Sequence, residues 1–183
     1  DVKRVFNAID QRLGPLSVLV NNAGILRQQC KLVELTAERI NTVLKTNVTG
    51  SFLCCIEAIK RMAYSHGAND GTIINVSSMA AKTGSPNEYI DYAASKGALD
   101  TLTRGLALEV AKEGIRVNGV RPGLISTQMH SDGGEPQRVT RLQDKIPMGR
   151  GGQVDEVANA ICWLASQEAS FTTGSFIDVA GGL

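Results

Sequence analysis

The sequence lacks a dominant charge and any long apolar run. Its 183 residues include 19 basic and 18 acidic side chains, which gives a formal net charge of +1. A chain so close to neutral has no global field that would attract nucleic acid or an anionic membrane. Its apolar runs are only as long as a strand, and no charged segment precedes one as in a signal peptide. We therefore expect a soluble, cytoplasmic protein with neither nucleic-acid nor membrane partners.

Metal-binding clusters are also missing. Four cysteines occur, at Cys30, Cys54, Cys55 and Cys162. No two of them are separated by two residues, and the histidines His66 and His130 lie far from any Cys/His group. Structural zinc sites and disulfide frameworks need closer groupings than these. The sequence therefore predicts no metal ion, and cysteines that are buried, reduced thiols.

What the sequence does contain is an alternation of helices and short apolar strands. Helix-period patterns cover residues 1–14, 36–67, 89–114 and 153–166. Strand-like runs cover residues 16–24, 72–78, 115–123 and 174–182. This order predicts a single α/β domain with a parallel sheet covered on both faces. The mixed polarity of 124–152 predicts a loop with a short helix, a segment that could serve as a lid. A distortion is expected near Asn47, because Val48, Thr49 and Gly50 weaken the long helix there.

Several polar turns follow the predicted strands directly. They read "NNAG" at 21–24, "SS" at 77–78 and "RPG" at 121–123. Ligands bind at the carboxyl ends of the strands in such sheets, so these turns should converge on one site. A further motif, "YAASK", puts Tyr92 and Lys96 four residues apart, hence on one face of a helix.

Together these motifs resemble the short-chain dehydrogenase/reductase family of nicotinamide-dependent oxidoreductases. The matching stretches are "NNAG", the asparagine of "KTNVTG", "INVSS", "YAASK", "RPGLIST" and the C-terminal "TTGSFIDVAGG". They cover essentially the whole chain in the family's order, with most similarity to the bacterial glucose/ribitol dehydrogenase-like subgroup. The resemblance implies a Rossmann-like, doubly wound parallel sheet. It also implies hydride transfer between NAD or NADP and the carbonyl or alcohol group of a small molecule.

The resemblance gives each motif residue a catalytic role. Tyr92 would be the general acid or base, and Lys96 would lower its pKa and bind the nicotinamide ribose. Ser78 would stabilise charge on the substrate oxygen, with Ser77 as the competing candidate. Asn47 would hold a water in a proton relay.

Cofactor contacts also follow from the resemblance. The residues implied are Asn21, Ala23, Gly24, Tyr92, Lys96, Pro122, Gly123, Ile125 and Thr127. We further expect Asn87, Glu88 and Tyr89 to line the substrate pocket. Lys82, Arg104, Arg116 and Arg121 are interpreted as ordinary surface or structural charges.

The glycine-rich phosphate-binding turn that begins the family's chains is absent. By comparison with the family, roughly 60 to 70 residues, about a βαβαβ half, would precede this sequence. The choice between NAD and NADP is therefore unreadable. The strand at 17–20 would have an open, apolar edge, so the 183 residues alone should be poorly soluble unless a further segment accompanies them. A stable, monomeric 19.5 kDa species in an intact-mass measurement would contradict this expectation.

Two functional readings remain open from the sequence. The first is an NAD(P)-dependent dehydrogenase or reductase. The second is a catalytically silent binding or scaffold subunit of the same fold, which the absent glycine-rich turn favours. Titration with NADH and NADPH would separate them. In either case the family implies a homodimer or homotetramer, paired through the 89–114 and 36–66 helices.

Overall fold

The computed structural model describes all of residues 1–183, and a parallel sheet of four strands lies at its centre. The strands are β1 (Val18–Asn21), β2 (Gly71–Val76), β3 (Ile115–Pro122) and β4 (Phe176–Val179). Their order in the sheet is β1-β2-β3-β4, and each neighbouring pair is parallel. Every residue of β2 is buried, because this central strand has neighbours on both sides and helices on both faces.

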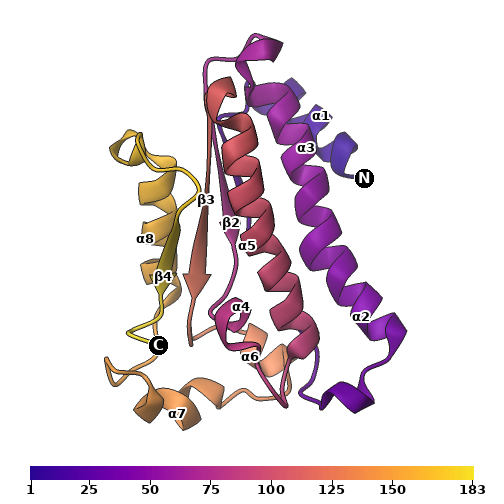
Figure 1. Cartoon of the computed structure of the whole chain (residues 1–183), viewed down its shortest axis with the longest axis vertical. Helices are drawn as coiled ribbons and strands as arrows, with labels where there is room; N and C mark the ends of the chain where they lie inside the picture. The colour runs from indigo at the N-terminus through magenta and orange to yellow at the C-terminus, as the bar shows by residue number, and fades with distance from the viewer.

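Eight α-helices surround this sheet. They are α1 (Val2–Leu13), α2 (Ala37–Leu44), α3 (Gly50–Met62), α4 (Ala80–Thr83), α5 (Ile90–Val110), α6 (Met129–Asp132), α7 (Arg138–Leu142) and α8 (Val154–Ala165). Single 3-10 turns occupy Leu32–Glu34, Tyr64–His66, Ala111–Glu113, Gln143–Lys145 and Gln167–Ala169. In Figure 1, α8 lies on one side of the strands and α3 and α5 lie on the other.

Two hydrophobic clusters, one on each face of the sheet, explain this layering. Ile73 packs with Phe6, Met62 and Leu106, which belong to the helices on one face. Its neighbour Ile74 packs with Val120 and Leu164 on the α8 side. Successive residues of a strand point to opposite faces, so an unbroken apolar run supplies both clusters. The predicted doubly wound α/β architecture is therefore confirmed.

The predicted distortion near Asn47 is a π-helical turn. It spans Lys45–Thr49 and joins α2 to α3. The backbone N–H of Gly50 bonds to the carbonyl of Lys45, one residue further back than in an α-helix. The widened turn carries a fully buried Asn47 toward the end of the sheet where the polar motifs lie.

Short helices gather at the carboxyl end of the sheet. Figure 1 shows α4, α6 and α7 at the end toward which β3 points. The 124–152 segment holds two short helices instead of the single one predicted, and α4 was not predicted at all. None of the helices has the length and apolarity that crossing a bilayer requires.

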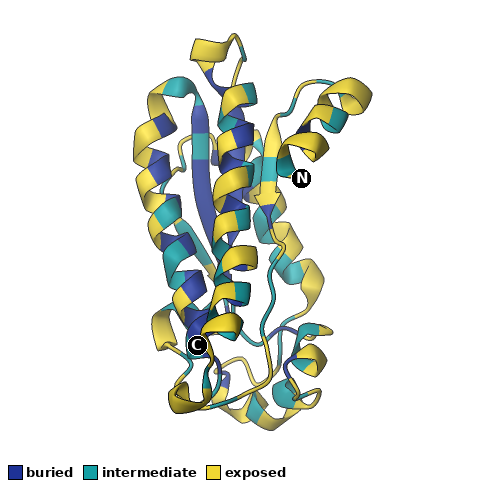
Figure 2. Cartoon of the chain, turned by 90° about the vertical axis from the view of Figure 1, so that its right-hand side faces the viewer, coloured by how far each residue is buried: buried dark blue, intermediate teal, exposed yellow.

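The most buried residues lie in the middle strands of the sheet and on the helix faces that cover it. Figure 2 shows the middle strands in dark blue, whereas the helices alternate between blue and yellow around their circumference. At the edge of the sheet, Val18 and Val20 of β1 are 38% and 39% exposed. All four cysteines are free, as predicted, but only Cys55 is buried. The prediction of burial was wrong for Cys162, which is exposed on α8, and for Cys30 and Cys54, which are only half-buried.

Candidate active site

The polar motifs meet at one cavity of about 690 Å³ at the carboxyl end of the sheet. Ten of the residues that the sequence singled out line it: Ala23, Gly24, Ser77, Ser78, Tyr92, Lys96, Pro122, Gly123, Ile125 and Thr127. They come from the segments that follow β1, β2 and β3 and from the first turns of α5. The parallel sheet brings these turns together because all its strands end on the same side.

Tyr92 and Ser78 interact in this cavity through their hydroxyl groups. Tyr92 lies in the first turn of α5 and is 9% exposed, and Ser78 follows β2. Burial raises the pKa of Tyr92, because the phenolate would lose its hydration, and a hydrogen bond with Ser78 partly offsets this rise. The phenol is therefore protonated at neutral pH.

Ser77 uses its hydroxyl differently. Its Oγ donates to the backbone carbonyl of Lys96 at 3.2 Å, and the side chain is buried. Ser78 Oγ accepts a hydrogen bond from the backbone N–H of Ala80 at 3.1 Å, which fixes the oxygen. Of the two serines, Ser78 is thus the one with a hydroxyl directed to Tyr92, whereas Ser77 ties the end of β2 to α5.

Lys96 is almost completely buried one turn after Tyr92. Its Nζ donates to the carbonyl of Val76 at 2.7 Å and lies 5.5 Å from the centre of the Tyr92 ring. Burial lowers the pKa of Lys96 to about 8, and the carboxylate of Asp100 opposes that shift. The prediction that the pKa of Tyr92 is lowered was wrong for this structure. Burial of the phenol dominates, and the lysine is itself close to losing its charge.

Asn47 holds the segment after β1 in place. Its Nδ2 donates to the carbonyl of Ile25 at 2.9 Å, and its Oδ1 accepts from the N–H of Ile25 at 2.8 Å. The same Nδ2 donates to Ser95 Oγ at 2.9 Å, which adds a tie to α5. The side chain acts on the neighbouring backbone and is not part of the cavity lining. Its own carbonyl accepts from Ser51 Oγ at 3.0 Å.

Small residues leave room for a flat or elongated ligand. A Cβ at Gly24 would lie 3.4 Å from both Asn47 Oδ1 and Lys96 Nζ, so a larger side chain would fill the space before the ammonium group. A Cβ at Gly123 would lie only 2.8 Å from the Cα of Ala180. Gly24 therefore leaves space before Lys96, whereas Gly123 permits the close approach of Ala180 to the end of β3, and Lys96 retains two further N–H donors for a ligand. The chemistry of this lining fits a nicotinamide riboside.

Asn21 does not contribute to the cavity, contrary to the sequence-based expectation. Its Nδ2 donates to Asn75 Oδ1 at 2.9 Å and to Cys55 Sγ at 3.3 Å. Because side chains alternate along a strand, Asn21 points with Leu19 toward α3, and it is Asn22 that lines the cavity.

The residues before α5 form an ion-pair cluster instead of a pocket wall. Neither Asn87, Glu88 nor Tyr89 lines the cavity, so that prediction was wrong. Glu88 binds Arg138 of α7 at 2.5 Å, and the Tyr89 hydroxyl donates to the carbonyl of Gly133. These contacts fasten the α6–α7 segment to the turn before α5 and engage the side chains of Glu88 and Tyr89 outside the cavity.

Nine further lining residues were not predicted as site residues, and they lie at the ends of β1 and β2 and on the α6 and α8 sides of the cavity. They are Val20, Asn22, Val76, Met129, His130, Val154, Val157, Ala158 and Ile161. The α8 residues belong to a predicted apolar helix face, but nothing indicated that part of this face would remain uncovered. His130 lies in the 124–152 segment, and its Nε2 hydrogen-bonds the carbonyl of Ile125 at 2.8 Å. No motif identified it.

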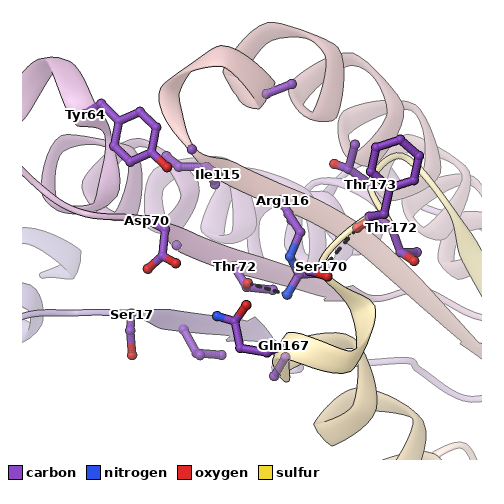
Figure 3. Close-up of a pocket in the computed structure, with 16 residues that line it drawn as sticks. Ser17, Tyr64, Asp70, Thr72, Ile115, Arg116, Gln167, Ser170, Thr172 and Thr173 are labelled. Atoms are coloured by element: carbon purple, nitrogen blue, oxygen red, sulfur yellow. Dashed lines mark hydrogen bonds between the residues drawn. The ribbon is translucent and has the colours of Figure 1, made fainter.

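A second cavity, of about 590 Å³, lies at the opposite, amino end of the strands. Figure 3 shows Arg116 there, surrounded by Asp70, Thr72 and Gln167. The guanidinium group donates to Thr72 Oγ1 at 2.9 Å and to the carbonyls of Ser166 and Thr172 at 3.2 and 3.3 Å. Arg116 thus ties the loop before β4 to the sheet, in agreement with its interpretation as a structural charge.

Comparison with known proteins places these observations in a family. Residues 1–183 match the family model described as enoyl-(acyl carrier protein) reductase. The chain is 66% identical over 181 residues to the uncharacterized oxidoreductase YgfF of Escherichia coli, covering 99% of this chain and 73% of that protein. It is 40% identical over 182 residues to the 3-oxoacyl-(acyl-carrier-protein) reductase FabG of Thermotoga maritima, covering 100% and 72%. It is 39% identical over 173 residues to a glucose and ribitol dehydrogenase homolog of Oryza sativa subsp. japonica, covering 93% and 57%. The chain therefore spans between 57% and 73% of the length of these relatives.

Proposed function

Because the chain belongs to the short-chain dehydrogenase/reductase family of oxidoreductases, we propose that it reduces a carbonyl, or oxidises an alcohol, of a small molecule with NAD or NADP. The observation that carries this proposal is the cavity shared by Tyr92, Ser78 and Lys96. A proton donor, a second hydroxyl and a cation around one space are the groups that carbonyl reduction requires.

The chemistry follows from the state of each side chain. The nicotinamide supplies the hydride for reduction and accepts it in oxidation. As the carbonyl oxygen gains charge, Tyr92 transfers its proton to it, so the phenolic O–H bond breaks and an alcohol O–H bond forms. The raised pKa of Tyr92 keeps this proton in place until it is needed. Ser78 donates a hydrogen bond to the same oxygen, and the ammonium of Lys96 stabilises the phenolate that remains.

The residues that would hold the cofactor surround Gly24 and Gly123. This part of the cavity wall consists mainly of backbone and small side chains, from Ala23, Gly24, Pro122 and Gly123. Lys96 has N–H donors for the ribose. Ile125 and Thr127 continue this surface toward α6. Asn47 acts indirectly, because it fixes the backbone at Ile25 beside Gly24. NAD and NADP are both candidates.

Cofactor binding and turnover together test the proposal. NADH and NADPH are titrated into the purified protein by fluorescence, and oxidation of the bound cofactor is followed with a panel of substrates. Relatives carry the names of glucose and ribitol dehydrogenase and 3-oxoacyl carrier-protein reductase, so the panel includes sugars, polyols and 3-oxoacyl thioesters. We expect one cofactor to bind at micromolar concentration. Binding of neither would refute the proposal and favour a scaffold role.

The tyrosine is tested by its closest isostere. Tyr92→Phe removes only the hydroxyl, and loss of a general acid lowers kcat by about 10²–10⁴-fold. Cofactor affinity should change by less than about twofold, since the ring that packs beside Lys96 remains. A Tyr92→Phe protein that turns over at the original rate would exclude Tyr92 as the acid, even if the cofactor binds.

We also propose that the protein assembles through α3 and α5. An apolar groove of about 680 Å³ runs between them, and Phe52 and Ile56 on its rim are 43% and 45% exposed. Small residues of α5, Ala98 and Gly105, also line the groove and would allow close helix packing. Light scattering should give a dimer or tetramer, and Ile56→Glu should give a monomer. A monomeric unmodified protein at micromolar concentration would refute this assembly.

A further inference from the structure

A buried carboxylate lies one helical turn after Lys96. Asp100 of α5 is 7% exposed, and its Oδ2 accepts a hydrogen bond from Arg121 Nε at 2.9 Å and forms an ion pair with Arg121 Nη2 at 2.8 Å. Its Oδ1 is the one buried side-chain nitrogen or oxygen atom of the chain without a hydrogen-bond partner. Leaving a carboxylate oxygen buried and unpaired is unfavourable, so this arrangement calls for an explanation.

Arg121 cannot satisfy the second oxygen because its guanidinium group is held from the other side. Its carbon lies 3.8 Å from the centre of the Phe176 ring, and its Nη1 is 3.4 Å from Asp178 Oδ1. Phe176 itself packs over Gly119, where a Cβ would lie 2.4 Å from the ring. Asp178 is further bound by Lys82 at 2.5 Å. The guanidinium group is thus fixed between β3, β4 and α5, and one oxygen of Asp100 stays unpaired.

The position of Asp100 relates it to Lys96. Residues four apart on a helix share a face, so both side chains emerge on the buried side of α5. Lys96 Nζ bonds to the carbonyl of Val76 and has no carboxylate within ion-pair distance. No acidic residue lines the cavity either. Asp100 is the carboxylate that lies one helical turn after Lys96, and its charge opposes the fall in the Lys96 pKa that burial causes.

We propose that Asp100 is a positioning residue for the reaction proposed above, in which its carboxylate, clamped by Arg121, keeps the buried Lys96 in its ammonium form at neutral pH. The inference rests on the proposed function, since it concerns the cation that stabilises the Tyr92 phenolate. Without the charge of Asp100, a larger share of Lys96 would be the neutral amine at neutral pH. In those molecules the proton would still pass from Tyr92 to the substrate oxygen, but the phenolate left behind would have no cation beside it.

Other ionisable groups near Lys96 are few. From α5 these are Tyr92 and Asp100, from β3 Arg121, and from α6 His130 on the far wall of the cavity. Neither the ends of β1 and β2 nor the α8 wall contributes an ionisable side chain to this cavity.

The test variant removes the negative charge of Asp100 and keeps the shape of its side chain. In Asp100→Asn the amide oxygen can still accept from Arg121. We expect the alkaline limb of the kcat/KM profile for cofactor-dependent reduction to move to lower pH by about one unit, because the variant removes a negative charge one helical turn from the ammonium group. The rate at pH 6 should stay within about twofold. Asp178→Asn is the matched control, because it also removes a carboxylate from Arg121. The alkaline limb of its kcat/KM profile should stay at the same pH as in the unmodified protein.

A second readout does not depend on turnover. Side-chain NMR of the ¹⁵N-lysine-labelled protein without cofactor, with the Lys96 signal assigned by its loss in Lys96→Met, gives the titration of Lys96 directly. The midpoint should fall by about one pH unit in Asp100→Asn and stay in Asp178→Asn. An unchanged midpoint in Asp100→Asn would overturn the proposal. If that variant does not fold, Asp100→Leu combined with Arg121→Met removes both charges of the pair and should give a smaller fall in the same direction, because the guanidinium charge is lost together with the carboxylate.

The pH profile and the NMR titration together distinguish a failure of the proposed function from a failure of the role proposed for Asp100. If the unmodified protein binds neither NADH nor NADPH but the Lys96 midpoint still falls in Asp100→Asn, the proposed function fails and the electrostatic coupling stands. If the unmodified protein is active and neither the limb nor the midpoint moves, the role of Asp100 fails and the proposed function stands.

Discussion

Replacing Lys96 by methionine is expected to stabilise the fold while it abolishes the proposed activity. Lys96 is 3% exposed, and its burial lowers its pKa from 10.5 to about 8. A change of that size corresponds to a cost of roughly 3 kcal/mol for keeping the ammonium in the folded protein at pH 7. Methionine has a similar length and no charge to bury. Against this gain stands the hydrogen bond to the carbonyl of Val76, whose loss costs about 1–2 kcal/mol. The net gain should be about 1–2 kcal/mol.

The stability difference between Lys96→Met and the unmodified protein depends on pH. An unfolded lysine has its ordinary pKa of 10.5, so at pH 7 Lys96 is protonated in both states and the folded protein bears the full cost. As the pH rises through 8, the folded state releases the proton first and the cost declines. It is about 1.5 kcal/mol at pH 9.5 and vanishes above 10.5. The advantage of Lys96→Met should therefore shrink to about zero at pH 9.5.

Urea unfolding followed by circular dichroism measures both effects. The free energy of unfolding is determined at pH 7 and pH 9.5 for the unmodified protein, for Lys96→Met and for Lys112→Met. Lys112 is exposed in the 3-10 turn after α5, so its replacement should change stability by less than about 0.5 kcal/mol at either pH. A Lys96→Met protein less stable than the original at pH 7 would refute the reasoning. So would an advantage that is the same at both pH values.

Three further predictions concern the neighbours of this lysine. Ser78→Ala should lower kcat/KM by about 10²-fold, whereas Ser77→Ala should act mainly on the melting temperature; steady-state turnover and thermal unfolding distinguish them. Gly24→Ala should weaken cofactor binding about tenfold in a fluorescence titration without loss of stability, because its methyl group takes up space beside Lys96; Gly97→Ala, with nothing within 4 Å, should bind normally. Asn47→Ala leaves the N–H and carbonyl of Ile25 unpaired and should cost about 2–4 kcal/mol in urea unfolding. Unchanged stability would show that Asn47 does not hold this segment.

The elements that could be predicted from the sequence are those with a strong local signal. The 89–114 pattern predicted a helix closed by Gly114, and α5 with its 3-10 turn ends there, at a φ of 75°. The β-branched residues and glycine after Asn47 predicted a defect in the long helix, and a π-turn is present at that point. Motif order along a parallel sheet predicted which turns would meet, since the carboxyl ends of parallel strands share one edge.

What could not be predicted depends on burial and on contacts between distant segments. The spacing of Tyr92 and Lys96 predicts that they are neighbours, but not how little water reaches them, and this decides the direction of the Tyr92 pKa. The role of Glu88 depends on Arg138, which lies 50 residues later in a segment without periodicity. Likewise, Asn21 and Asn22 are indistinguishable as letters in a motif. Only the pleat of β1 separates the one that faces the core from the one that faces the cavity.

Buried hydrogen bonds determine that Asn21 faces the core and Asn22 faces the cavity. Asn21 donates to Asn75 on the neighbouring strand, and Asn75 donates to Thr103 of α5 at 2.9 Å. Asn21 and Asn75 are directly paired in the register of β1 and β2. A slip of one residue would turn Asn21 away from Asn75 and bury Asn22 in an apolar layer, leaving polar groups unsatisfied on both sides of the sheet. Apolar residues alone would oppose such a slip weakly in a strand of four residues. The amide pair therefore fixes where β1 ends, and with it the position of Gly24 before Lys96.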